Sequence, residues 1–137
     1  MEKIKVNVEW TENNFAAVAF GNNINGSIVV TNKDLDQLKE DFIEALEFHI
    51  EGSVKDGDKL PNWVVNKQYE LEFVLETSAL LRDAEKYTSL AAISRASGLN
   101  QKQLSHYANG RIKPREDQRK RIITGLHKIG NKFINVV

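Results

Sequence analysis

One short segment, residues 90–114, carries polar side chains at a spacing suited to contact with nucleic-acid bases. The outward positions of its second half are Gln101, Lys102, Ser105 and His106. Glutamine can pair with adenine and lysine with guanine in the major groove of DNA. The chemistry expected of this group is therefore base recognition, and the alternative for His106 is an ordinary surface histidine.

Side chains suited to phosphate contact flank this group. They are Asn100, Arg111, Lys113 and Arg115. Asn100 precedes the expected second helix, whose N-terminus attracts phosphate through its unpaired N–H groups and its dipole. The three cations follow that helix, so the set could hold phosphates on either side of the bases that are read.

Apolar residues at helical spacing must position these polar groups. They are Leu90, Ile93, Leu99, Leu104 and Tyr107. The small Ser94 lets two helices approach each other, and Gly98 can adopt the left-handed conformation of a tight turn. The pattern predicts a helix-turn-helix whose second helix is held at a fixed angle. The alternative is that these helices form only a packing bundle, or bind protein while keeping this shape.

Residues 88–129 resemble the Cro and lambda-repressor type of helix-turn-helix, also called the XRE family. The resemblance includes the Asn-Gly pair after the second helix, the basic residues and proline that follow, and a closing helix over residues 118–130. The chain departs from the commonest pattern at Ala108, where an acidic residue often precedes the Asn. The resemblance implies sequence-specific DNA binding, with base contacts from Gln101, Lys102 and His106.

Helical periodicity in the C-terminal part predicts four short helices, over residues 78–86, 89–97, 101–109 and 115–130. Thr88 and Asn100 stand where N-caps belong, and Gly98 and Gly110 stand where C-caps belong. Asn100 with Gln103 resembles a capping box. The apolar tail, residues 131–137, is expected to pack on these helices or against a second chain.

The N-terminal part alternates in hydropathy and predicts strands over residues 3–10, 15–20, 27–31 and 68–76. A helix after Thr31 or Asn32 as N-cap, ending at Gly52, comes before the last strand. The expected inward residues of that strand are Tyr69, Leu71, Phe73 and Leu75. The predicted fold class is α+β: a βββαβ sheet-plus-helix domain over residues 1–77, then an all-α helix-turn-helix domain over residues 78–137.

This N-terminal part resembles the HicB antitoxin family, whose partial ribonuclease-H-like domain has the order βββαβ and is often fused to a DNA-binding domain. Similar details are the strand-turn-strand opening, the helix end over residues 44–52 and the DGDKLPN segment over residues 56–62. Residues 21–32 replace the Pro-rich, Gly-Cys loop of the family. The resemblance implies an antitoxin of a type II toxin-antitoxin system that neutralises a small basic HicA-like ribonuclease toxin and represses its own operon.

The 137 residues have a formal net charge of zero, but the charges are segregated. Residues 1–76 hold 7 Lys and Arg against 15 Asp and Glu, and residues 77–137 hold 12 against 4, which gives minus 8 and plus 8. A basic half suits DNA, and an acidic half suits a cationic protein. The carboxylates expected to meet the toxin are Glu40, Glu44, Glu70, Glu72 and Glu76. The alternative for each carboxylate is an ordinary solvated face.

Catalysis, cofactors and metal binding are not expected. No Gly-rich phosphate loop, HExxH or Ser/His/Asp signature appears, and His49, His106 and His127 lack the spacing of metal ligands. The strand interiors are apolar where metal-dependent phosphoryl chemistry would need carboxylates. The absence of Cys fits a cytoplasmic location. The longest apolar run, residues 15–20, is far shorter than a membrane span, and no signal peptide is expected.

Two other classes of function stay open. The chain could be a transcriptional regulator whose N-terminal domain binds a small ligand or oligomerises, or it could be a protein-interaction adaptor that has lost DNA binding. A homodimer or a higher homo-oligomer is expected, because helix-turn-helix proteins commonly bind paired half-sites about one helical turn apart.

Overall fold

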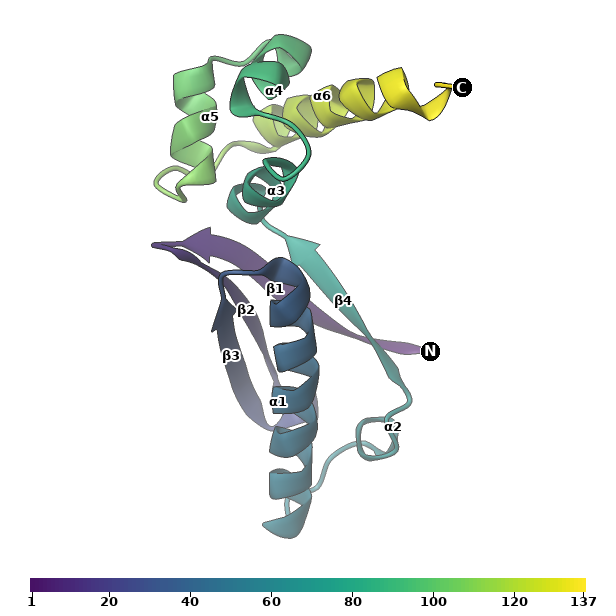
Figure 1. The fold of residues 1–137 in the computed structure, drawn as a ribbon. Helices are drawn as coiled ribbons and strands as arrows, with labels where there is room; N and C mark the ends of the chain where they lie inside the picture. The colour runs from purple at the N-terminus through teal and green to yellow at the C-terminus, as the bar shows by residue number, and fades with distance from the viewer. The chain divides into compact units, whose positions relative to one another are not determined.

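The computed structural model describes residues 1–137 and has an α+β fold with four strands and six α-helices (Figure 1). The strands are β1 (Glu2–Thr11), β2 (Asn14–Gly21), β3 (Gly26–Asn32) and β4 (Tyr69–Leu75). The helices are α1 (Leu35–Lys55), α2 (Asn62–Val65), α3 (Thr77–Ala84), α4 (Leu90–Ser97), α5 (Gln101–Ala108) and α6 (Glu116–Ile134), and the short 3-10 helix η1 covers Asn22–Ile24. The α+β class with an N-terminal four-stranded sheet is confirmed.

The chain divides into two compact units. The first unit consists of Met1–Glu9 and Asn13–Glu76. The second unit consists of Thr77–Val137 together with Trp10–Glu12, the end of β1 and the turn that follows it.

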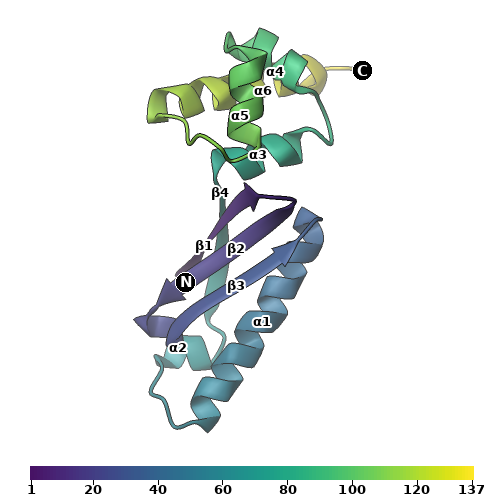
Figure 2. The ribbon, with the colours of Figure 1, turned by 90° about the vertical axis from the view of Figure 1, so that its left-hand side faces the viewer.

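In the first unit the four strands lie in the order β3-β2-β1-β4 (Figure 2). β2 and β3 are antiparallel, with Phe15 opposite Asn32 and Gly21 opposite Gly26. β1 and β4 are parallel, from Glu2 opposite Tyr69 to Val8 opposite Leu75. A parallel pair needs a crossover connection, and the chain between β3 and β4 contains α1 and α2.

The core of the first unit lies between α1 and one face of the sheet. Ile4, Val6 and Val8 of β1 are buried, as the alternation predicts. The buried positions of α1 recur at steps of three and four residues: Leu35, Leu38, Phe42, Leu46 and Ile50. The helix thus buries one apolar stripe against the sheet, because side chains at this spacing share one side of a helix.

Both predicted ends of α1 are wrong. The N-cap is Asp34, whose carboxylate accepts a hydrogen bond from the backbone N–H of Gln37 at 2.8 Å. Asn32 instead accepts from the backbone N–H of Asp34 at 2.9 Å and so shapes the turn before the helix. The helix also continues through Gly52 to Lys55, because Ser53 of the last turn is buried and the backbone of Asp56 still bonds to Gly52.

Asp41 of α1 is held by two amide side chains. The Gln37 amide donates to its Oδ1 at 2.8 Å, and the Asn32 amide donates to its Oδ2 at 2.9 Å. These hydrogen bonds favour the carboxylate, so they lower the pKa of Asp41 below its ordinary value, the Gln37 bond more than the Asn32 bond.

Gln37→Ala should therefore raise the pKa of Asp41, and Asn32→Ala should raise it less. NMR titration of the Asp41 carboxyl group measures both shifts. Because the folded-state pKa is lowered, the stabilisation is present above the ordinary pKa of the carboxyl and is lost as the pH falls through the folded value. An Asp41 pKa that does not move in Gln37→Ala would contradict this arrangement.

The second unit has its own core. It is formed by Leu81, Ile93, Leu99, Leu104, Tyr107, Ala108 and Ile122, with Ala84, Leu90, Leu126 and Ile129 partly buried around it. Of the five apolar residues predicted to position the polar groups, four are buried, and Leu90 is half-buried at the margin. The four predicted helices of this region are all present, with changed ends.

Local chemistry explains the changed start of α4. Ser89 rather than Thr88 is the N-cap of α4, because its hydroxyl accepts from the backbone N–H of Ala92 at 3.1 Å. The C-cap of α5 is Asn109, not the predicted Gly110, which follows it. α6 runs past Gly130 to Ile134. The prediction that the apolar tail packs on its own helices is wrong: Phe133, Ile134, Val136 and Val137 are all exposed.

α4 and α6 approach each other closely at Gly125, a buried position of α6. A Cβ built at Gly125 would lie 3.0 Å from the backbone nitrogen and 3.1 Å from the Cβ of Ser97 in α4. Gly130, five residues later in the same helix, has nothing within 4 Å of such a Cβ. The two glycines form a matched pair that separates helix propensity from packing.

Gly130→Ala should stabilise the protein by about 0.5–1 kcal/mol, because alanine loses less backbone entropy in a helix than glycine. Gly125→Ala gains the same propensity but must push α4 away from α6, and overpacking of this kind costs about 1–3 kcal/mol. Urea denaturation should therefore find Gly125→Ala the less stable of the two. Equal stability of the two variants would contradict the close approach.

Candidate nucleic-acid interface

The turn between α4 and α5 is fixed by local hydrogen bonds. Gly98 has a φ of +75° and donates its backbone N–H to the Ser94 carbonyl, so it is the left-handed C-cap that the sequence predicts. The Ser94 hydroxyl donates to the Leu99 carbonyl at 2.5 Å, and the Leu99 N–H donates to the Ser97 hydroxyl at 3.2 Å. The Gly98 bond satisfies a carbonyl that the end of α4 would leave unpaired, and the two serine bonds pair the backbone of Leu99 in the turn.

Arg121 of α6 supports the same turn from outside. Its Nη2 donates to the Ser97 carbonyl at 3.3 Å, and a Cβ at Gly98 would lie 3.0 Å from this nitrogen. The turn thus needs glycine for its backbone conformation and has little room for a side chain.

The two sides of α5 differ sharply. Leu104, Tyr107 and Ala108 are buried in the core of the second unit. Of the four predicted base-contacting residues, Lys102 and His106 point away from Leu104, Ser105 lies at the flank, and Gln101 lies in line with Ala108, one residue into the helix. Gln101 and Lys102 are exposed, and Ser105 and His106 are half-buried. The helix therefore presents its polar row most openly in its first turn.

The N-terminus of α5 is capped by Asn100, as predicted. Its Oδ1 accepts from the backbone N–H of Lys102 at 2.8 Å. The predicted capping box with Gln103 does not form, because the Gln103 amide donates to the Tyr107 hydroxyl at 2.6 Å. A phosphate contact from Asn100 would therefore use its amide nitrogen, since its oxygen serves the cap.

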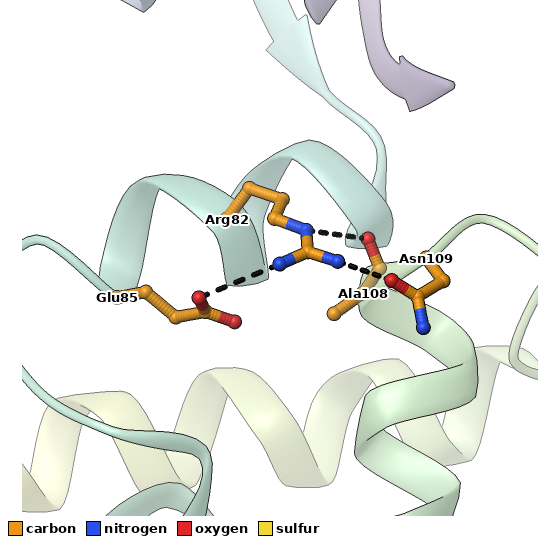
Figure 3. A network of polar contacts seen from close by, with 4 residues as sticks. All are labelled: Arg82, Glu85, Ala108 and Asn109. Atoms are coloured by element: carbon orange, nitrogen blue, oxygen red, sulfur yellow. Dashed lines mark hydrogen bonds and ion pairs between the residues drawn. The ribbon is translucent and has the colours of Figure 1, made fainter. Parts of the chain in front are cut away.

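A polar network that the sequence did not predict holds the other end of α5 (Figure 3). Arg82 of α3 donates from Nε to the Ala108 carbonyl at 3.0 Å and from Nη2 to the Asn109 side-chain oxygen. Its Nη1 also forms an ion pair with Glu85 at 3.5 Å. Within the second unit, its guanidinium lies 5.2 Å from the centre of the Trp10 ring. One residue thus ties α3 to the C-terminal end of α5.

Arg82→Ala should lower the free energy of unfolding by about 1–3 kcal/mol, because it leaves the carbonyl at the end of α5 without its charged donor. Arg82→Lys should recover little of the loss, because an ammonium group lacks the planar fork that reaches several acceptors. Thermal or urea unfolding measures both variants. Arg95→Ala removes the same charge at an exposed position of α4 and should stay within about 0.5 kcal/mol of the parent. An equal loss in Arg82→Ala and Arg95→Ala would contradict the role of the network.

The predicted phosphate-contacting cations follow α5. Arg111, Lys113 and Arg115 are exposed, and Asn100 is exposed at the other end of the helix. The four residues thus flank α5 at both ends. Arg119, a further cation of α6, is engaged within the unit, where its Nη1 donates to the Thr77 hydroxyl at 2.9 Å.

The five carboxylates predicted to meet a toxin do not form one patch. Glu40 and Glu44 are exposed on α1, whereas Glu70 and Glu72 are exposed on β4. By strand alternation, Glu70 and Glu72 point to the sheet face away from Tyr69, Leu71 and Phe73. Glu76 is half-buried just after β4, where its backbone N–H donates to the Val8 carbonyl at 2.8 Å.

No group of three or more His, Asp or Glu side chains in the chain is arranged to hold a metal ion. His49 contacts the carbonyls of Ile24 and Asn25 through its Nε2, at 2.7 and 3.2 Å. No helix combines the length and the apolar character needed to cross a membrane. Comparisons of the chain with protein-family models, with curated proteins and with solved structures found no match.

Proposed function

We propose that the second unit is a helix-turn-helix that binds double-stranded DNA sequence-specifically, with α5 as its recognition helix. The observation that carries this proposal is the first turn of α5. Gln101 and Lys102 are exposed there, while Leu104, Tyr107 and Ala108 of the same helix are packed in the core. Recognition helices contact base edges mainly through their N-terminal residues.

The charge of the second unit supports the same reading. It contains 12 Lys and Arg against 5 Asp and Glu, a formal charge of plus 7. The exposed Arg111, Lys113 and Arg115 would hold the phosphates beside the bases that Gln101 and Lys102 read. His106 and Ser105 would contact only the margin of the DNA major groove, because both side chains are half-buried.

DNA binding of this kind suits a homodimer. Two recognition helices reach paired half-sites only when two copies are joined. We propose that the exposed apolar residues at the end of α6 and just after it join the two copies: Phe133, Ile134, Val136 and Val137.

Gln101→Ala and Lys102→Ala should each weaken binding to the operator by about 10- to 100-fold, because a good base contact discriminates by about 1–3 kcal/mol. Fluorescence anisotropy with DNA from upstream of the gene, and with a scrambled duplex, measures the loss and its specificity. Lys128→Ala is the control: it removes an exposed cation from the C-terminal half of α6 and should leave the preference for the operator over the scrambled duplex unchanged. Unchanged operator affinity in Gln101→Ala and Lys102→Ala would overturn the assignment of α5.

Arg111→Ala should weaken binding to both duplexes alike and reduce the slope of log affinity against log salt by about 0.9, the value for one phosphate contact. A change confined to the operator duplex would move Arg111 from the phosphate contacts to the base contacts.

We further propose that the whole chain is an antitoxin of the HicB type, which neutralises a small basic HicA-like ribonuclease in the cytoplasm and represses its own operon through the second unit. The first unit supports this with its β-β-β-α-β order and with 7 Lys against 14 Asp and Glu, a formal charge of minus 7. A cationic toxin would be attracted to such a surface. The alternative is a transcriptional regulator whose first unit binds a small ligand or oligomerises.

Co-expression of the full chain with the neighbouring short reading frame tests this proposal. We expect the neighbour to arrest growth when expressed alone and the full chain to relieve the arrest. Co-purification should yield a stoichiometric complex with a small basic protein. If the neighbour is harmless and does not co-purify, the antitoxin proposal is wrong. The alternative is then favoured, in which the chain is a transcriptional regulator whose first unit binds a small ligand or oligomerises.

A further inference from the structure

The outer edge of β4 is open. β4 pairs only with β1, so it ends the sheet. In a strand with one neighbour, the backbone N–H and C=O groups of alternate residues point away from the sheet and can pair with another strand. β4 contains seven residues, with neither the proline nor the lysine that often protects an edge strand.

The apolar side of β4 is only partly covered. Tyr69, Leu71 and Phe73 are half-buried, although the sequence predicts them as inward residues. Ile4 and Val6, the partners of Leu71 and Phe73 in β1, are buried. The reason is the position of α1, which packs mainly on β2 and β3. A shallow groove of about 440 Å³ therefore remains between α1 and β4, and Ile43, Leu46, Tyr69, Leu71 and Phe73 form its apolar lining.

A second, mostly apolar hollow of about 310 Å³ continues this groove along α1. Ile50, Val54 and Val65 line it, and it shares Glu47 and Lys67 with the first hollow. Ile43 and Val54 are exposed by 43% and 45%, so the apolar lining is open to solvent along α1.

Acidic side chains border this groove. On α1, Glu47 and Glu51 line the two hollows. They belong to a row that falls within about 80° of the helix circumference and continues onto its exposed side: Asp36, Glu40, Glu44, Glu47 and Glu51. On the other side of the open edge, Glu70 and Glu72 point to the opposite sheet face. The ion pairs of Glu47 with Lys67 and of Glu72 with Lys3 are both 3.7 Å long and largely exposed, so they neutralise this field weakly.

The groove also accommodates a cation of its own chain. The Lys39 ammonium lies 5.6 Å from the centre of the Phe73 ring. Burial, and the charge of Glu47 to a smaller extent, raise the pKa of Tyr69 above its ordinary value. The contact with Phe73 shows that a positive charge can lie beside the groove, and the raised pKa of Tyr69 indicates a partly apolar environment in which a negative charge is disfavoured.

We propose that the open edge of β4 and the groove beside it bind an extended, basic segment of a partner protein as a fifth strand. Alternate apolar side chains of that segment enter the groove at Ile43, Leu71 and Phe73, and the intervening Lys or Arg side chains meet Glu70 and Glu72. This is β-strand addition, in which backbone hydrogen bonds give affinity and alternate side chains give specificity. The inference rests on the partner binding proposed for the first unit, and it specifies the surface and the chemistry of the partner.

A synthetic peptide as long as β4, seven residues with alternating lysine and valine, is the probe. It is added to the full chain, and hydrogen exchange and calorimetry are measured. We expect slower exchange of β4 amides and a dissociation constant below about 1 mM. A peptide with glutamate in place of lysine should not bind.

Two pairs of variants on the full chain separate the groove from general charge attraction. Ile43→Asp should weaken binding of the lysine peptide at least tenfold, about 1.4 kcal/mol. Phe48 lies on the same helix but beside β3, the opposite edge strand of the sheet, so Phe48→Asp should not weaken binding. Glu70→Lys should weaken binding, whereas Asp56→Lys, also on the β3 side, makes the same charge change and should have little effect.

Several results would overturn the proposal: no binding at about 1 mM peptide, protection of β3 rather than β4, or an affinity that Ile43→Asp and Glu70→Lys leave unchanged. Protection of β4 that rises with protein concentration in the absence of peptide would assign the edge to a second copy of the chain. The same variants distinguish failure of this proposal from failure of the antitoxin proposal. If Ile43→Asp and Glu70→Lys still bind and neutralise the neighbour's product as the parent does, strand addition at β4 is wrong and the antitoxin function is retained. If the neighbour is harmless while the peptide binds at β4, strand addition is retained and the antitoxin function is wrong.

Discussion

The parallel pairing of β1 with β4 is the constraint on which the first unit depends. Strands that run in the same direction cannot be joined by a tight turn, so the chain must cross one face of the sheet before β4 can form. α1 makes most of that crossing and packs over β2 and β3. β4 therefore arrives at the edge of the sheet, beyond the cover of α1, with Tyr69, Leu71 and Phe73 half-buried. A single topological requirement produces both the core and the open groove.

The second unit is organised around α5. The helix has only eight residues, too few for stable helicity in isolation, so its position depends on tertiary contacts. The core holds one side of it, Asn100 caps its beginning, and Arg82 binds the carbonyl at its end. These contacts use buried and terminal groups and leave Gln101 and Lys102 exposed. A helix fixed in this way can present side chains to a rigid ligand with little loss of conformational entropy on binding.

The two proposed activities use surfaces of opposite charge. Arginines and lysines dominate the second unit, and carboxylates dominate the first, so each unit repels the ligand proposed for the other. This segregation explains why a chain of zero net charge could bind both DNA and a basic protein. Charge of this kind guides encounter more than it sets affinity, so apolar contacts such as those at Ile43 and Phe73 would carry much of the affinity for a partner.

The sequence by itself determined the features that depend on neighbours along the chain. Alternation in residues 3–10 predicted the buried Ile4, Val6 and Val8, and helical spacing predicted the core positions Ile93, Leu99, Leu104 and Tyr107. Gly98 and Asn100 were identified as caps because their conformations and hydrogen bonds involve residues only a few positions away.

Tertiary structure decided what depends on distant residues. Gly52 does not end α1, because the helix continues to the buried Ser53 and helix ends depend on packing as well as on local propensity. Gly130 does not end α6 either, although the residues after it are exposed. Arg82 reaches Ala108 and Asn109 across more than twenty residues, and no local pattern indicates that contact. The carboxylates that charge counting grouped together are divided between α1 and β4, since a sequence gives the amount of charge but not the face that carries it. The position of β4 in the sheet cannot be predicted from its sequence either, because its alternation of apolar and polar residues resembles that of a strand whose apolar side is buried. Only the order of the strands in the sheet places it at the edge, because edge position is a property of pairing between distant segments.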